Sequence, residues 1–190
     1  MDSGQHAEPR KRSIFRSILS LVIMVAFVFG LSWAVLTFVF QPYEKPSGSM
    51  ETTIMTGDMV FSEKVSYYLR DPEPGDIVTF QDPEIPGRVL IKRCIAVGGQ
   101  TVDLVDGQVV VDGVALNEPY THGLPSEPLK TALGTDFSYP YTIPAGHLWV
   151  MGDNRTNSQD SRYFGAIEES TVTGRGLLIY WPLNNFGLLG

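Results

Sequence analysis

Cysteine and histidine are both scarce in this sequence. Its one cysteine, Cys94, excludes an intramolecular disulfide, so cysteine pairing says nothing about the redox compartment. His6 lies near the N-terminus, and neither His122 nor His147 stands in a recognisable catalytic-triad motif. We interpret the last two as surface or strand-end residues, so histidine is not expected to carry acid–base chemistry here.

Basic residues are also few. Lysines and arginines number 14 against 21 aspartates and glutamates, and Arg10, Lys11, Arg12 and Arg16 all precede a long uncharged run. The rest of the chain therefore carries the acidic excess. This disfavours a nucleic-acid partner, because phosphate binding needs a basic surface. The 190 residues leave room for one globular domain and a short appendage.

The uncharged run extends from Ser17 to Phe40. As a helix it would be about 36 Å long, enough to cross a hydrocarbon core of about 30 Å. A cleaved signal peptide has a shorter apolar core of about 7 to 15 residues, so 17–40 is predicted to be a transmembrane anchor. Four basic residues precede the span, whereas only one, Lys45, closely follows it. By the positive-inside rule the tail 1–16 is expected in the cytoplasm and the domain 41–190 outside the cell membrane.

The part after the span predicts a mostly β fold with antiparallel strands. Short apolar or alternating runs lie between turn signals. They are 58–65, 76–80, 89–97, 101–105, 108–111, 147–151 and 173–181. Asp106-Gly107 and Asp112-Gly113 are dipeptides typical of tight hairpin turns. By contrast, 117–140 holds four prolines without a period, which predicts a long surface excursion.

Three short clusters hold residues suited to chemistry: Pro46-Ser47-Gly48-Ser49-Met50, Leu90-Ile91-Lys92-Arg93, and the polar run from Gly152 to Arg162. The first can equally be a flexible turn. In the second, strand alternation directs Lys92 and Arg93 to opposite faces, so at least one charged side chain points to the buried or cleft side. An edge strand, or a lysine whose amine extends to solvent, would also explain this pair. The third can be a solvated turn. A calcium loop is disfavoured, because Arg155 takes the third ligand position and Ser158 replaces the required glycine.

Taken in this order, and with Pro74-Gly75-Asp76-Ile77-Val78 between the first two, the clusters resemble those of the bacterial type I signal peptidases. The resemblance covers nearly the whole chain. It implies a membrane-bound serine endopeptidase with a β domain of the signal peptidase type, which removes signal peptides from secreted preproteins after small residues. Signal peptides and the lipid bilayer are the expected partners of a monomer that needs no cofactor or metal. One departure is Thr52, where the family usually has proline, so the rigidity of that turn stays open.

The resemblance also implies a role for each residue of the clusters. Ser49 would be the nucleophile and Lys92 its general base, with Ser47 and the backbone amide of Ser49 as the oxyanion hole. Ser158 would hydrogen-bond Lys92 and orient its amine. The remaining expectations are a supporting scaffold of Arg93, Asp153, Arg155, Asp160 and Arg162, with Arg93 paired to one of the carboxylates, and substrate-pocket positions at Met50, Leu90 and Ile91.

Lysine acts as a base only when its amine is neutral. Its ordinary pKa of about 10.4 must therefore fall by about 2 to 3 pH units, which burial can achieve. The apolar neighbours of Lys92 in the sequence provide such burial: Val89, Leu90, Ile91, Cys94 and Ile95.

Three other classes of protein share some of these features. Sortases also carry an N-terminal anchor, but Cys94 lacks their sequence setting, and a free cysteine is more often a buried structural residue. A tethered β domain that binds exported chains without cutting them would have no need of Ser49, Lys92 and Ser158 together. Self-cleaving repressors share the serine and lysine but are soluble, with a DNA-binding module where this chain has its span.

Overall fold

The computed structural model describes residues 10–44, 47–132 and 135–189. Lys45, Pro46 and the first nine residues of the expected tail, with His6, lie outside the described residues. The chain divides into two compact units, Met1–Val39 and Phe40–Gly190.

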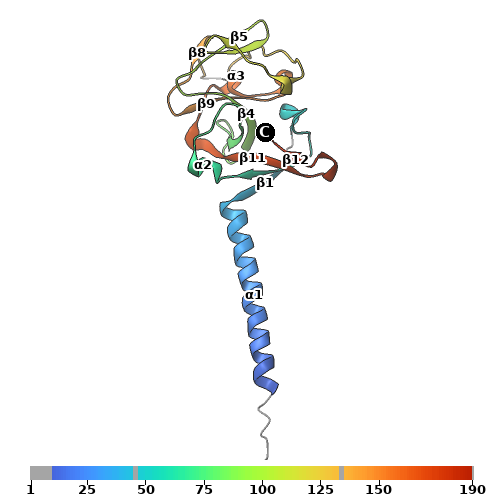
Figure 1. Ribbon diagram of the computed structural model, residues 1–190. Coiled ribbons are helices and arrows are strands. Elements are labelled where there is room, and N and C mark those ends of the chain that lie inside the picture. The colour runs from blue at the N-terminus through green and yellow to red at the C-terminus, as the bar shows by residue number, and fades with distance from the viewer. Residues whose placement is uncertain (1–9, 45–46, 133–134, 190) are drawn as a thin grey trace, which may run out of the picture. The chain divides into compact units, whose positions relative to one another are not determined.

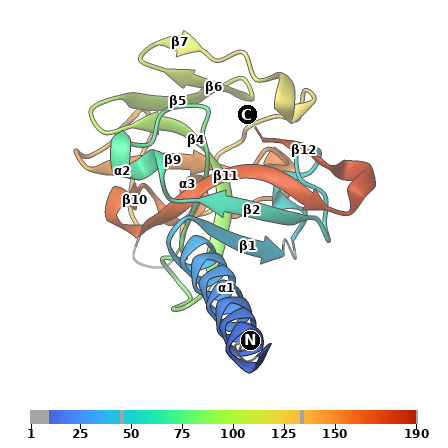
Figure 2. The same cartoon turned by 60° about the horizontal axis from the view of Figure 1, so that its bottom comes forward.

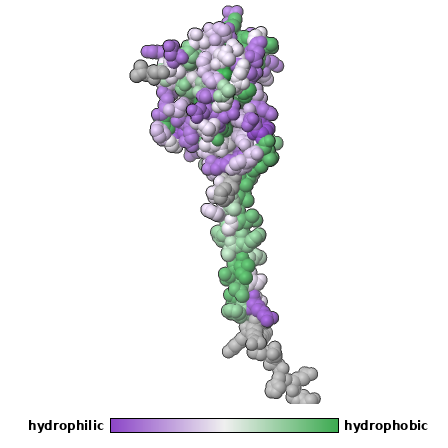
Figure 3. Space-filling view, turned by 90° about the vertical axis from the view of Figure 1, so that its left-hand side faces the viewer, coloured by the Kyte–Doolittle hydropathy of each residue, from purple (hydrophilic) through white to green (hydrophobic). Residues whose placement is uncertain are grey.

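The first unit is the helix α1, Arg10–Phe38. Residues Ile14–Val35 within it are long and apolar enough to cross a membrane, and none of their most apolar window is buried against the protein. Figure 3 shows an apolar surface along this helix. A helix that is apolar on its exposed faces is suited to lipid rather than water. The predicted span 17–40 was too long at its C-terminal end, because α1 ends at Phe38 and a strand begins at Phe40.

The second unit is built on two antiparallel sheets (Figure 1). The larger has the strand order β1-β2-β11-β3-β4-β9-β10, and β12 also pairs with β11. Its strands are β1 Phe40–Glu44, β2 Met59–Glu63, β3 Ile77–Gln81, β4 Val89–Val97, β9 His147–Met151, β10 Ile167–Glu168, β11 Val172–Trp181 and β12 Gly187–Leu188. The mostly β, antiparallel fold predicted from the sequence is therefore confirmed.

The smaller sheet has the order β7-β6-β5-β8 and lies at the opposite end of this unit from β1 (Figures 1 and 2). Its strands are β5 Thr101–Val105, β6 Gln108–Val111, β7 Val114–Ala115 and β8 Tyr141–Thr142. Asp106 and Asp112 both have positive φ, as do the glycines that follow them. Positive φ at both central residues is the conformation of a tight hairpin turn, so the two predicted hairpins are confirmed.

Single helical turns connect the strands. They are η1 Gly48–Met50, α2 Ser66–Leu69, η2 Pro119–Thr121, η3 Arg155–Asn157, α3 Ser161–Phe164, η4 Glu169–Thr171 and η5 Leu183–Asn185. Two of them, η1 and η3, fall within clusters that the sequence singled out.

All seven predicted strands are present, four of them with the predicted bounds. The others differ by one or two residues at an end. The strands that prediction missed are β1, β7, β8, β10 and β12, of which four have only two residues. Such short strands carry too little alternation to be recognised in a sequence.

The segment 117–140 is less superficial than predicted. Its residues Thr121, Ser126 and Ala132 are buried. The reason is that the side chains of Glu118 and Ser126 bond the buried Arg155, so the segment packs on the domain instead of extending from it. Residues 133 and 134 lie outside the described part.

Candidate active site

The first cluster forms a tight turn between β1 and β2. Within η1, Ser49 is 6% exposed and Met50 is completely buried. Successive residues of such a helix point about 120° apart, so Ser49 faces the groove that it lines while Met50 enters the core beside Ile54 and Val60. Met50 is not among the described residues that line the groove at Ser49, so its place in the substrate pocket stays a prediction.

The second cluster lies on β4 and brings its lysine to this serine. Lys92 pairs with Val78 of the neighbouring strand β3. Its Nζ lies 2.6 Å from Ser49 Oγ, within hydrogen-bond distance. Arg93 points to the opposite face, as strand alternation predicts. Two residues 43 positions apart in the sequence therefore meet in a buried pair.

Burial changes the proton affinity of that lysine. Lys92 is 3% exposed, and desolvation lowers the pKa of its amine to about 8. Arg162 and Arg88 lower the pKa as well, whereas the carboxylates of Asp160 and Asp153 raise it. The direction and size agree with what a lysine base requires.

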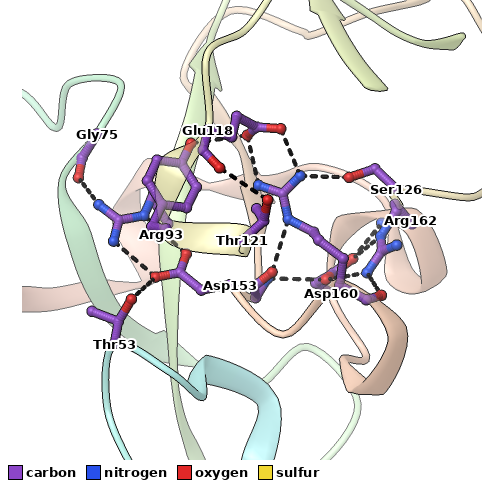
Figure 4. A network of polar contacts seen from close by, with 12 residues as sticks. Thr53, Gly75, Arg93, Glu118, Thr121, Ser126, Asp153, Asp160 and Arg162 are labelled. Carbon is purple, nitrogen blue, oxygen red and sulfur yellow. Dashed lines mark hydrogen bonds and ion pairs between the residues drawn. The ribbon is translucent and has the colours of Figure 1, made fainter. Parts of the chain in front are cut away.

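Ion pairs hold the third cluster in place (Figure 4). Arg93 donates from Nε and Nη2 to the carboxylate of Asp153, at 2.9 and 2.8 Å. Arg162 donates in the same two-pronged way to Asp160, which also accepts the backbone N–H of Gly152. All four charged side chains are at most 5% exposed. The expected pairing of Arg93 with a loop carboxylate is therefore present.

The same loop holds the turn that carries Ser49, the expected nucleophile. Asn154 donates from its backbone N–H to the carbonyl of Ser49 and from its side chain to the carbonyl of Gly48. The Thr53 hydroxyl donates a hydrogen bond to the Asp153 carboxylate. These bonds order the turn without the proline that Thr52 replaces.

Ser158 lies in the same groove, but it does not bond Lys92 in this structure. Its Oγ is buried and has no hydrogen-bond partner among the described residues. The hydroxyl lies against Gly152, where an added Cβ would be 2.3 Å from Ser158 Oγ and 2.4 Å from the carbonyl oxygen of Ser49. The expected Ser158–Lys92 hydrogen bond is therefore not formed in this structure, in which the Lys92 amine bonds Ser49 Oγ.

Ser47 is the exposed one among the described residues of the first cluster. Its Oγ lies 3.4 Å from Ser49 Oγ, so its hydroxyl is close to the atom expected to attack.

A groove of about 670 Å³ leads to these residues. Leu90 and Ile91 line it, as predicted, together with residues that the sequence did not identify: Tyr43, Val60, Thr79, Leu129, Tyr163 and Phe164. Thr79 pairs with Ile91 across the β3–β4 ladder, which a correct alignment of the two predicted strands would have indicated. Neither His122 nor His147 is among the described residues that line this groove.

One edge of β4 is open beside the groove. Its partner β9 pairs with it only from Arg93 onward, while β3 pairs with Val89 to Arg93 on the other side. Among the described strands, none covers the second edge of residues 89–92. An extended peptide can therefore add to it by main-chain hydrogen bonds.

Cys94 has no place in this arrangement. It is fully buried, and burial raises the pKa of its thiol to about 12. A thiol of this kind is not a nucleophile at neutral pH, which disfavours the sortase alternative.

The Asp160–Arg162 pair is expected to act through stability and loop order. Asp160→Ala or Arg162→Ala leaves a buried charge without its partner, which should destabilise the fold by about 3 to 5 kcal/mol and lower activity with it. Thermal unfolding and cleavage assays of both variants, with the exposed Asp71→Ala as control, check this. Lost catalysis at unchanged thermal stability and unchanged substrate binding would instead indicate a direct chemical role.

Comparison with known proteins gives consistent results. The family described as "Signal peptidase, peptidase S26" matches residues 14–181. A probable signal peptidase I of Mycobacterium leprae is 32% identical, over 97% of this chain and 82% of that protein. A probable signal peptidase I-1 of Synechocystis is 37% identical, over 89% of this chain and 84% of that protein. A crystal structure of a signal peptidase I from Enterococcus faecalis has 33% sequence identity and a TM-score of 0.45, and the match covers 56% of this chain and 97% of that one.

Proposed function

This chain belongs to the signal peptidase family, peptidase S26, and we propose that Ser49 and Lys92 are its nucleophile and general base. Family membership makes it a membrane-bound serine endopeptidase that removes signal peptides from preproteins. The assignment of the two residues is supported chiefly by one observation. The Lys92 Nζ is buried, has a lowered pKa, and lies 2.6 Å from the Ser49 hydroxyl.

The reaction follows from this geometry. When the amine of Lys92 is neutral, its lone pair takes the proton of Ser49, and Oγ attacks the carbonyl carbon of the scissile peptide bond. The oxyanion that forms would be stabilised by the Ser47 hydroxyl and the Ser49 backbone amide. Protonated Lys92 then gives its proton to the leaving amine. A water molecule, deprotonated by the same lysine, hydrolyses the acyl-enzyme.

Ser158 is proposed to orient the base during this cycle. Its hydroxyl is buried in the groove without a hydrogen-bond partner among the described residues. Because buried polar groups usually have a partner, this supports a hydrogen bond to Lys92 during the reaction. A rotation about its side-chain bond would turn the hydroxyl without moving the loop. Arg93, Asp153, Asp160 and Arg162 would hold that loop and the nucleophile turn.

The preprotein is proposed to bind as an added strand along residues 89–92 of β4. Its side chains would alternate between the groove and solvent, and Leu90 and Ile91 would form part of a shallow apolar pocket. A shallow pocket would reject large side chains and so would give cleavage after small residues. Ser47, Ser49, Lys92 and Ser158 all come from one chain, which supports action as a monomer, and the net charge of −7 supports the absence of a nucleic-acid partner.

The direct test is cleavage of a secretory preprotein by the purified full-length protein. Ser49→Ala should abolish cleavage, whereas the exposed Ser170→Ala should leave it unchanged. Undiminished cleavage by Ser49→Ala would exclude Ser49 as the nucleophile.

The orientation in the membrane is a further proposal, supported by the basic residues that precede the span. Protease added to intact spheroplasts should digest the unit from Phe40 onward, while a tag at the N-terminus and a cytoplasmic marker protein stay intact. Protection of that unit until the cells are lysed would reverse the orientation.

A further inference from the structure

The irregular segment 118–132 lies against the loop that carries Ser158. Four of its residues bond the loop or α3 beyond it. The contacts are Glu118 and Ser126 with Arg155, the Glu127 carbonyl with Arg162, and the Ala132 backbone N–H with the Tyr163 carbonyl. We call this segment the strap. It lies outside the clusters that the sequence singled out.

Glu118 is the carboxylate of the strap that meets a buried arginine. The side chain of Arg155 is completely buried, and that of Glu118 is 9% exposed. Arg155 donates from Nη1 and Nη2 to the two carboxylate oxygens, at 2.9 and 2.6 Å, and from Nη1 to Ser126 Oγ at 2.6 Å. A buried guanidinium without a counter-charge is strongly disfavoured, so Glu118 fixes the position of Arg155.

Arg155 in turn bonds Gly152, the residue that packs against Ser158 and Ser49. Its Nε donates to the carbonyl of Gly152 at 3.0 Å. Gly152 is the residue so close to Ser158 Oγ and the Ser49 carbonyl that an added Cβ would lie less than 2.5 Å from each. Displacement of Arg155 therefore displaces the backbone on which both serines rest.

Tyr120 connects the strap to the second arginine. Its hydroxyl donates to Glu118 Oε1 at 2.9 Å, and its ring lies 4.0 Å from the guanidinium carbon of Arg93. Arg93 in turn pairs with Asp153 and follows Lys92 in β4. In Figure 4, Glu118 and Arg93 lie on one side of the network, with Asp153 and Asp160 below them. The strap thus contacts the scaffold beside both members of the dyad.

We propose that Glu118 is a positioning residue for the dyad, acting through Arg155 and Gly152 and assisted by Tyr120. The proposal rests on the assignment of Ser49 and Lys92 above. Its consequence is that loss of the Glu118 carboxylate loosens the loop over Lys92 and admits water to the amine.

Water at the Lys92 amine would shift the pH profile of cleavage, which a general loss of stability would not do. Desolvation is the main cause of the lowered pKa of Lys92, so a loosened loop raises that pKa toward its ordinary value. The charged groups acting on Lys92 are Asp160, Asp153 and Arg162 from the third cluster and Arg88, which immediately precedes β4. Glu44, Asp82, Glu84 and Lys130 line the same groove. Glu118→Gln leaves all of these in the chain, so the shift in its pH profile reports the loop.

The experiment measures preprotein cleavage by the full-length protein between pH 6 and 10. Glu118→Gln should lower kcat roughly 10-fold to 100-fold, as expected for a small misplacement of reacting groups, with little change in KM. The acid limb of its pH profile should move to higher pH. Glu118→Asp, which keeps the charge, should recover part of kcat. The matched control is Glu127→Gln, because the strap uses only the backbone carbonyl of Glu127.

If Glu118→Gln does not fold, Tyr120→Phe still tests the proposal. It removes one hydroxyl and retains the ring on Arg93, and it should shift the acid limb in the same direction by a smaller amount. A parental acid limb in every folded strap variant, with activity falling only in proportion to the folded fraction, would overturn the proposal. Ser49→Ala in the same assay separates the two hypotheses, since cleavage that survives it would contradict the dyad itself.

Discussion

Lys92→Arg should lose roughly 10²-fold to 10⁴-fold in cleavage rate although it keeps the positive charge, the range attributed to a general base. A guanidinium cannot be deprotonated in the working pH range, so it cannot take the proton of Ser49. In the parent protein, by contrast, the rate should rise with pH and level off above about 8, the pKa of Lys92 in the fold. Below that pH the neutral fraction falls about tenfold per pH unit.

The measurement is cleavage rate against pH for the parent, for Lys92→Arg and for the double variant His122→Ala/His147→Ala. The histidine variant should keep most of the parental rate at every pH, because neither histidine lines the groove among the described residues. If Lys92→Arg survived and the histidine variant were inactive, a serine–histidine mechanism would replace the serine–lysine one.

Gly152→Ala should be nearly as damaging, although it adds a single methyl group. The new Cβ would lie 2.3 Å from Ser158 Oγ and 2.4 Å from the carbonyl oxygen of Ser49. The serine side chain can rotate away, but the backbone carbonyl can move only with the whole nucleophile turn. We expect a loss of at least about 100-fold in kcat from the displaced nucleophile. Overpacking should lower the free energy of unfolding by about 1 to 3 kcal/mol.

Gly187→Ala on β12 is the matched control, because its added Cβ would meet nothing closer than 3.9 Å. It should change neither kcat nor thermal stability appreciably. Parental kinetics for Gly152→Ala would show that the turn and the loop are not packed as the structure has them. Thermal unfolding of both variants separates the loss of stability from the loss of kcat.

The sequence predicted the central strands well and the edges of the fold poorly. Gln108–Val111 alternates in burial and Val89–Val97 is a short, mostly apolar run, so both strands were found with their correct ends. Strand β1 was missed because Phe40 continues the apolar run of α1, and composition does not mark where the helix ends. The two-residue strands depend on tertiary pairing that no local pattern encodes.

The candidate site was predictable as far as motifs reach. Ser49 and Lys92 were identified by the resemblance of their clusters, and the structure brings them to 2.6 Å. Met50 is packed in the core, and the motif does not say which residue of a tight turn faces inward. The part played by Glu118 was invisible in the sequence. It depends on an ion pair across 37 positions, within a segment whose composition indicates only a loop.

The burial of Lys92 also couples the stability of this protein to pH. Between about pH 8 and the ordinary lysine value of about 10.4, the unfolded chain holds a proton that the folded chain has lost. The free energy of unfolding therefore rises with pH across this window. Below it, the folded state contains a buried ammonium that is disfavoured by about 3 kcal/mol relative to water. Through this residue, the alkaline conditions expected to raise activity also make the fold more stable, and the group proposed as the general base weakens the protein at neutral pH.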